Sequence, residues 1–287
     1  MIRKFFLAPL AAAALALPVN GEGADPAEPE IAPEDRAHWA FLPLDTGNIP
    51  GGFAAAENPV DAFIGAKLAE TGLAFAPSAD KATLLRRVTF DLTGLPPTLG
   101  EIREFLGDGS PAAYERVVDR LLASSRYGEH WAQHWLDVVR FAESDGFEFD
   151  QERPDAWRYR DWVISKLNED ASYAGFVTAQ LAGDESTPPD PVATGFLMAG
   201  PDMVDINLPE ERRHNFLNDM TATAGSVLLG LSVGCAQCHD HKREAFSIHD
   251  FYRLRAFFEN TVVDPERSKQ MPAVVAERLI SASQPSP

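Results

Sequence analysis

Apolar residues recur at helical spacing along residues 58–260, and no convincing run of strand-like alternation interrupts them. Asn58 followed by Pro59 predicts a helix start, because Asn caps helix N-termini and proline fits the first helical position. The sequence Thr98-x-x-Glu101 is a capping box and predicts another start. The pattern therefore predicts an all-α fold, a multi-helix bundle-like domain that follows an irregular, proline-rich N-terminal segment.

Each predicted helix has an apolar face expected to point inward. A long helix is predicted from Leu208-Pro209 through Leu231, running towards Cys235, and Ser247-x-x-Asp250 caps a last one. The expected inward residues include Val60, Phe63 and Ile64 in the first helix, Leu85 and Val88 in the second, and Trp131, His134, Trp135 and Val138 in the fifth.

The N-terminus has the pattern of a targeting segment. Arg3 and Lys4 precede an apolar run, residues 5–17, that is short for a membrane span of about 20 residues but typical of a signal peptide. The alternative is an uncleaved N-terminal anchor. The expected protein is exported, periplasmic or extracellular, without an integral membrane span in the mature chain. The predicted organisation is a signal peptide at 1–21, a proline-rich acidic linker at 22–57, a helical domain carrying C-x-x-C-H at 58–260 and a polar C-terminal tail at 261–287.

Composition restricts the classes of partner. The chain of 287 residues is 45% apolar and has a formal net charge of −18. That acidic excess argues against nucleic acid or an anionic membrane as a partner bound through bulk electrostatics. It fits a soluble protein, or one that docks a basic partner.

The two cysteines carry the strongest chemical signal. Cys235 and Cys238 stand three apart and His239 follows at once, which gives C-x-x-C-H, the attachment sequence of a c-type haem. Two thiols on one helical turn can each form a thioether to the porphyrin, and His239 would then be the proximal ligand of the haem iron. The expected function is electron transfer, or support of a partner oxidoreductase through a redox partner protein. Candidate sixth ligands or site neighbours are His241, His134, His214 and Met220.

Other interpretations of these residues remain open. Cys235 and Cys238 could form a disulfide within a non-haem binding or scaffold domain. With His239 and His241 they could hold zinc, although four ligands within seven residues strain a tetrahedral shell. His130 and His134 share a helix face, but Trp131 stands where the H-E-x-x-H motif of metalloproteases needs Glu. The interpretation favoured there is a polar His130 and an His134 packed between tryptophans.

An acidic loop, residues 143–153, precedes a segment rich in arginine and tryptophan. Paired carboxylates and exposed aromatics could serve a calcium site or a carbohydrate-associated domain, with Trp157 in a sugar-binding face. The alternative is a solvated loop whose carboxylates pair with the following arginines while the aromatic rings enter the core. No P-loop, Rossmann fingerprint or G-x-S-x-G elbow is present.

Several stretches together resemble the domain of unknown function 1549 type, which accompanies planctomycete-type cytochromes. The resemblance covers about residues 38–260 and implies an exported protein with a haem c site at Cys235, Cys238 and His239. It implies little about reaction or substrate. The stretches that carry it are 84–98, 114–148, 153–170, 180–184, 193–197, 229–242 and 250–258.

Overall fold

A computed structural model gives the fold of the described parts of the chain, and the all-α prediction is confirmed. Within these parts there is no β-strand, and a single isolated antiparallel bridge joins Ser144 to Glu152. The predicted signal peptide and all of the predicted tail beyond Thr261 lie outside the described residues. The structure describes residues 31–45, 47–51, 58–146, 150–201 and 208–261.

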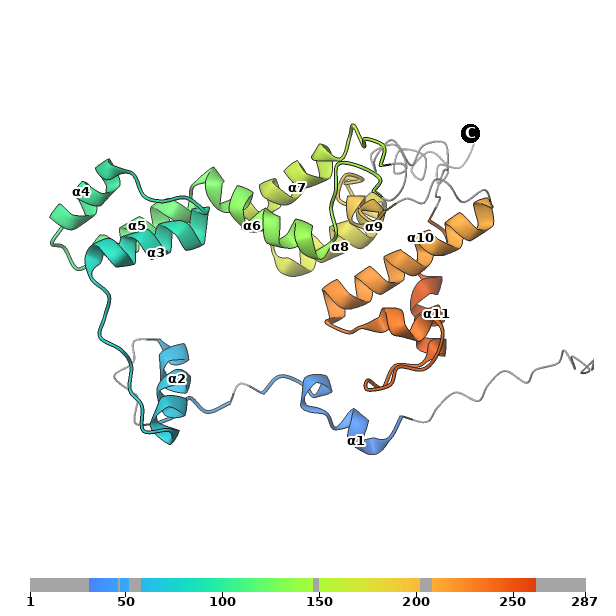
Figure 1. Ribbon diagram of the computed structural model, residues 1–287, viewed down its shortest axis with the longest axis horizontal. Helices are drawn as coiled ribbons and strands as arrows, with labels where there is room; N and C mark the ends of the chain where they lie inside the picture. The colour runs from blue at the N-terminus through green and yellow to red at the C-terminus, as the bar shows by residue number, and fades with distance from the viewer. Residues whose placement is uncertain (1–30, 46, 52–57, 147–149, 202–207, 262–287) are drawn as a thin grey trace, which may run out of the picture.

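The helices follow one another along an elongated body, with α3 to α5 at one end, α6 and α7 in the middle and α8 to α11 at the other end (Figure 1). The first part comprises α1 (Pro33–Arg36), η1 (Trp39–Phe41), α2 (Pro59–Glu70), α3 (Lys81–Thr93), α4 (Leu99–Gly107), α5 (Ala113–Leu122) and α6 (Ser125–Val138). The second part comprises α7 (Trp157–Asn168), α8 (Tyr173–Ala182), η2 (Gly183–Glu185), α9 (Gly195–Met198), α10 (Pro209–Ala224), η3 (Gly225–Leu229), η4 (Val233–Gln237) and α11 (Ile248–Ala256).

The predicted helix starts are confirmed by their capping hydrogen bonds. The Asn58 side chain accepts from the Val60 backbone N–H at 2.9 Å. Thr98 and Glu101 form the predicted capping box of α4, and Ser247 and Asp250 form that of α11. These short polar side chains satisfy backbone donors that have no partner inside the helix, so each start is fixed by local chemistry.

The main core lies where α6 packs along α7. Buried Leu136, Tyr159 and Val163 meet Phe196 from α9 and Leu217 from α10 in one continuous cluster. A second, smaller cluster joins α3, α4 and α5 through the buried residues Leu85, Phe105 and Ala113.

Two predicted helix faces were wrong. In α6 the buried line is Gly128, Ala132 and Leu136, whereas Trp131, His134 and Val138 are exposed. The small residues Gly128 and Ala132 form the buried face because they let α7 pack close to α6. An added Cβ at Gly128 would lie 2.6 Å from the Asn168 side chain.

In α2 the expected inward residues Val60, Phe63 and Ile64 are 59%, 48% and 44% exposed, while Ala62 is buried. Periodicity predicted the helix but not which of its faces packs.

The predicted long helix towards Cys235 is shorter than expected. Regular α10 ends at Ala224, a π-helical turn follows over Gly225–Leu229, and Gly230 ends it in the left-handed conformation. The physical reason is packing: an added Cβ at Gly225 would lie 2.2 Å from a methyl group of Val233. The chain therefore turns back on the end of its own helix before it reaches the cysteines.

Candidate functional site

The site predicted from C-x-x-C-H lies on a short 3₁₀ turn, η4, between the end of α10 and the start of α11 (Figure 1). Val233 and Ala236 are completely buried and fix this turn to the protein body. Cys235 and Cys238 are both exposed and both are free thiols. The turn therefore hides its apolar residues and presents its two thiols to solvent.

Two hydrogen bonds attach the turn to α11. The Tyr252 hydroxyl donates to the Gln237 carbonyl at 3.2 Å. The carboxylate of Asp240 accepts from the backbone N–H of Ile248, in the first turn of α11, at 2.9 Å. Asp240 thus places an acidic side chain at a helix N-terminus, where the helix dipole favours it. The residues on both sides of Cys238 are held, although the thiol itself is open.

The ring of His239 is oriented by its own backbone. Its Nδ1 lies 2.8 Å from the carbonyl oxygen of Asp240. A carbonyl oxygen can only accept, so this contact places a proton on Nδ1, and in the neutral imidazole the Nε2 lone pair is then available. Histidines that bind metal commonly donate their other ring nitrogen to a carbonyl or carboxylate, which fixes the tautomer and the ring orientation.

The four other candidate ligands lie in different surroundings. Met220 is 1% exposed inside the main core, and the Nδ1 of His241 accepts from the Glu244 backbone N–H at 2.9 Å. His214 is exposed and its Nδ1 accepts from Arg255 Nη2 at 2.6 Å.

The fourth candidate, His134, is exposed. Its ring centroid lies 5.3 Å from that of Trp131, which is exposed as well, so the prediction of a packed His134 was wrong. The half-buried member of that pair is His130.

The competing interpretations of the cysteines differ in what they need. A disulfide needs Cys235 and Cys238 joined, and here both thiols are free. A zinc site needs at least three gathered ligands, and no group of three or more His, Cys, Asp or Glu side chains in the described ranges is arranged to hold a metal ion. The donor set does fit a c-type haem, which requires two accessible thiols and one imidazole with a free Nε2.

The acidic segment before α7 uses its charges internally. Arg153 and Asp145 are both buried, and the Arg153 Nε donates to Asp145 Oδ1 at 2.8 Å. Arg160 pairs with Glu143 at 2.5 Å on the surface. For these two carboxylates the structure therefore agrees with the alternative interpretation, in which loop carboxylates pair with the arginines that follow them.

The aromatic residues that follow divide between core and surface. Trp162 packs in a stacked arrangement on Phe176, with ring centroids 5.3 Å apart. Trp157 is 46% exposed, with the Arg158 guanidinium 5.7 Å from its ring centroid.

Sequence reasoning missed the residues that position the site. Asp240 and Tyr252 hold the turn to α11, and Gly225 makes room for Val233 beneath it. The Asp directly after the C-x-x-C-H motif was visible in the sequence, but nothing in its spacing indicated that it reaches the next helix. The Gly225–Val233 contact depends on a turn of the chain that hydrophobic periodicity does not report.

No helix in the described ranges is both long and apolar enough to cross a lipid bilayer.

Comparison with known proteins identifies a family for this chain. Neither a curated protein nor a solved structure matches the chain. A family model described as PSCyt2, protein of unknown function (DUF1549), matches residues 59–263, which is well over half of the chain. The chain therefore belongs to the PSCyt2 family of proteins of unknown function.

Proposed function

We propose that the protein is an exported haem c-binding protein, with the haem attached through Cys235 and Cys238 and ligated by His239. Its task would be electron transfer or support of a partner oxidoreductase. Bound haem would supply the redox chemistry, since haem iron can accept and donate single electrons. The proposed export rests on the signal-peptide pattern of residues 1–21, and it matches the extracytoplasmic compartment in which bacteria attach c-type haem.

The observation that carries the proposal is the state of the three side chains on the η4 turn. Both thiols are free and exposed, and the His239 ring donates from Nδ1 to a backbone carbonyl so that Nε2 is free. A disulfide would consume both thiols and burial would close them to a ligand, whereas here both are free and exposed.

Each residue has a defined part in this proposal. Cys235 and Cys238 would hold the haem by adding across its two vinyl groups: each addition would form one carbon–sulfur bond, the thiol proton would pass to the neighbouring vinyl carbon, and no external oxidant would be consumed. Asp240 positions His239 through its carbonyl and fastens the turn to α11 through its carboxylate. Tyr252 restrains the backbone just before Cys238 by donating to the Gln237 carbonyl.

The test is production of the full chain in a host with a haem c maturation system, followed by a pyridine haemochrome spectrum and intact-mass measurement of the denatured protein. We expect one covalently retained haem per chain and removal of the signal segment. The double variant Cys235→Ser, Cys238→Ser should retain none. Ser232→Ala, in an exposed residue just before the same turn, is the matched control and should keep the haem.

Colourless wild-type protein from a host that matures a reference cytochrome c would contradict the proposal. A mass lower by two hydrogens would instead indicate the Cys235–Cys238 disulfide. Free thiols with a metal that is lost on denaturation would indicate the zinc alternative.

A further inference from the structure

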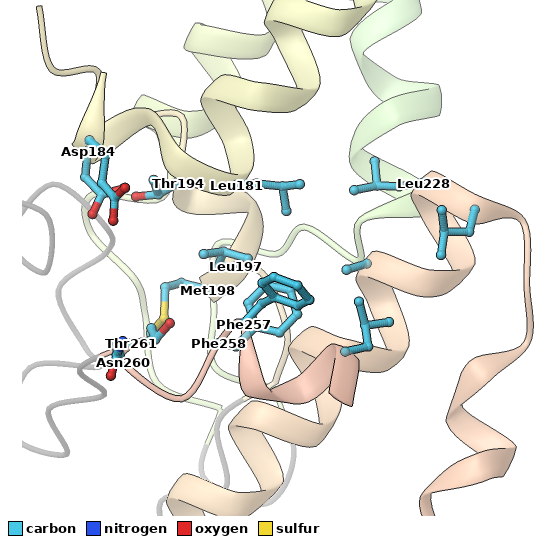
Figure 2. A pocket seen from close by; sticks show the side chains of 14 residues that line it. Leu181, Asp184, Thr194, Leu197, Met198, Leu228, Phe257, Phe258, Asn260 and Thr261 are labelled. Atoms are coloured by element: carbon cyan, nitrogen blue, oxygen red, sulfur yellow. The ribbon is translucent and has the colours of Figure 1, made fainter. Parts of the chain in front are cut away.

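A cavity of about 460 Å³ lies between the α8–α9 region and the paired ends of α10 and α11 (Figure 2). Its walls are mostly apolar, with Leu197, Met198, Leu228, Leu254 and Phe257 among the lining side chains. The volume is within the range of small-molecule pockets, about 300–1,000 Å³. None of the residues of the η4 turn lines it, so this cavity is separate from the proposed haem attachment site.

The cavity has one polar side and one apolar side. Figure 2 shows Asp184 and Thr194 together on one side, Leu228 on the opposite side and Phe258 between them. Glu185 lines the cavity next to Asp184. A ligand that fills this space would therefore meet carboxylates at one end, leucine side chains at the other and the Phe258 ring between them.

The polar side offers hydrogen-bond acceptors that are not in use. Among the described residues neither the Asp184 nor the Glu185 carboxylate has a hydrogen-bond or ion-pair partner. The single hydroxyl proton of Thr194 is committed to the Pro191 carbonyl at 2.7 Å, so this oxygen presents only lone pairs to the cavity. Two carboxylates and one accepting hydroxyl suit a group that is positively charged and rich in N–H donors.

We propose that this cavity binds amphipathic primary amines, with the ammonium group at Asp184, Glu185 and Thr194 and the apolar body against Leu228 and Phe258. The net charge of −18 raises the local concentration of such cations and disfavours anions of the same shape. Apolar walls contribute affinity in proportion to the area of ligand they cover. The inference does not depend on haem attachment.

The test is isothermal titration calorimetry on the full chain with hexyl-, octyl- and decylammonium below their micellar concentrations. Affinity should rise about threefold to fourfold for each added methylene until the cavity is full. Decanoate should bind at least tenfold more weakly than decylammonium, because it would place a carboxylate against two carboxylates. Decyltrimethylammonium, which keeps the charge and lacks N–H donors, should bind between the two.

Asp184→Asn should weaken decylammonium about tenfold, the range of one charge-assisted hydrogen bond. Asp91→Asn is the matched control, since it removes the same charge from an exposed position on α3 that does not line the cavity. Equal affinity for decylammonium and decanoate, or absence of saturable binding by wild-type protein, would overturn the proposal. Unchanged binding in Asp184→Asn together with Glu185→Gln would overturn the assignment of the headgroup position.

Discussion

The loop and helix at residues 143–162 and the η4 turn at residues 233–240 both carry reactive residue types, yet they use them differently. In the first region the Arg153 guanidinium is buried, and it donates to Asp145 and, at 2.7 Å, to the Gly200 carbonyl. In the turn, Cys235 and Cys238 are exposed and unbonded. In the first region the polar groups bond to one another and hold the chain together. In the turn the backbone is held, and the side chains remain open to a ligand.

A second network, which joins Tyr159 of the first region to Trp135 and Gln180 outside it, follows the same rule. The Tyr159 hydroxyl, completely buried, donates to Gln180 Oε1 at 2.6 Å, and Trp135 Nε1 donates to the same oxygen at 2.9 Å. Burial raises the pKa of the Tyr159 hydroxyl far above its ordinary value, which keeps it neutral. Of the residues that suggested a ligand surface in the sequence, Arg153 and Tyr159 are therefore part of the core, whereas Trp157 is 46% exposed.

The largest expected effect is on the buried ion pair. Arg153→Ala should lower the free energy of unfolding by about 3–5 kcal/mol, because it leaves the Asp145 carboxylate buried without its cation. Urea unfolding followed by circular dichroism measures it.

Arg158→Ala is the matched control for that change, since Arg158 pairs with Asp155 on the surface with 47% of its side chain exposed. It should cost no more than about 1 kcal/mol. Equal losses in the two variants would show that the buried Arg153–Asp145 pair does not hold the 143–162 region together.

The next largest effect on stability is expected at the Gly225–Val233 contact, which lies beneath the η4 turn. Gly225→Ala should destabilise the protein by about 1–3 kcal/mol, since the new methyl group would collide with Val233. Adding Val233→Ala should recover part of that loss by removing the colliding methyl groups. The comparison requires unfolding curves of both single variants and the double variant, and strict additivity would contradict the contact.

The sequence predicted those features of the fold and of the site that depend on residues close together in the chain, and missed those that depend on contacts between elements. The capping residues Thr98 and Ser247 act within four residues, so local pattern predicted both helix starts. The inward face of α6 depends on the approach of α7 to Gly128, and the bend after Ala224 depends on Val233, so periodicity within one segment missed both. The thiol and imidazole motif was visible, but its anchoring by Asp240 and Tyr252 crosses between elements.

A smaller, pH-dependent effect is expected at the start of α11, next to the turn. Partial burial raises the pKa of Asp250, but hydrogen bonds from the Ser247 backbone and hydroxyl and the charge of Arg253 outweigh it, so the net pKa is lowered. A folded-state pKa below the unfolded value means that this carboxylate stabilises the fold above about pH 4 and ceases to do so as pH falls further.

Asp250→Asn keeps a capping oxygen and removes the titration. We expect the wild type to exceed the variant in unfolding free energy by about 0.5–1 kcal/mol at pH 6, and the difference to vanish at pH 2. Urea unfolding at both pH values measures it. A difference that persists at pH 2 would place the contribution of Asp250 in packing and not in its charge.

The smallest expected change in stability is the one that most sharply separates the two regions. In protein made without haem maturation, Cys235→Ser with Cys238→Ser should alter the free energy of unfolding by no more than about 0.5 kcal/mol, because both thiols are exposed and unbonded. The same double variant should abolish covalent haem in a maturing host. A turn that can lose its chemistry without losing its fold is one whose side chains serve a ligand, whereas a large loss of stability would make the cysteines part of the structural framework, as Arg153 is.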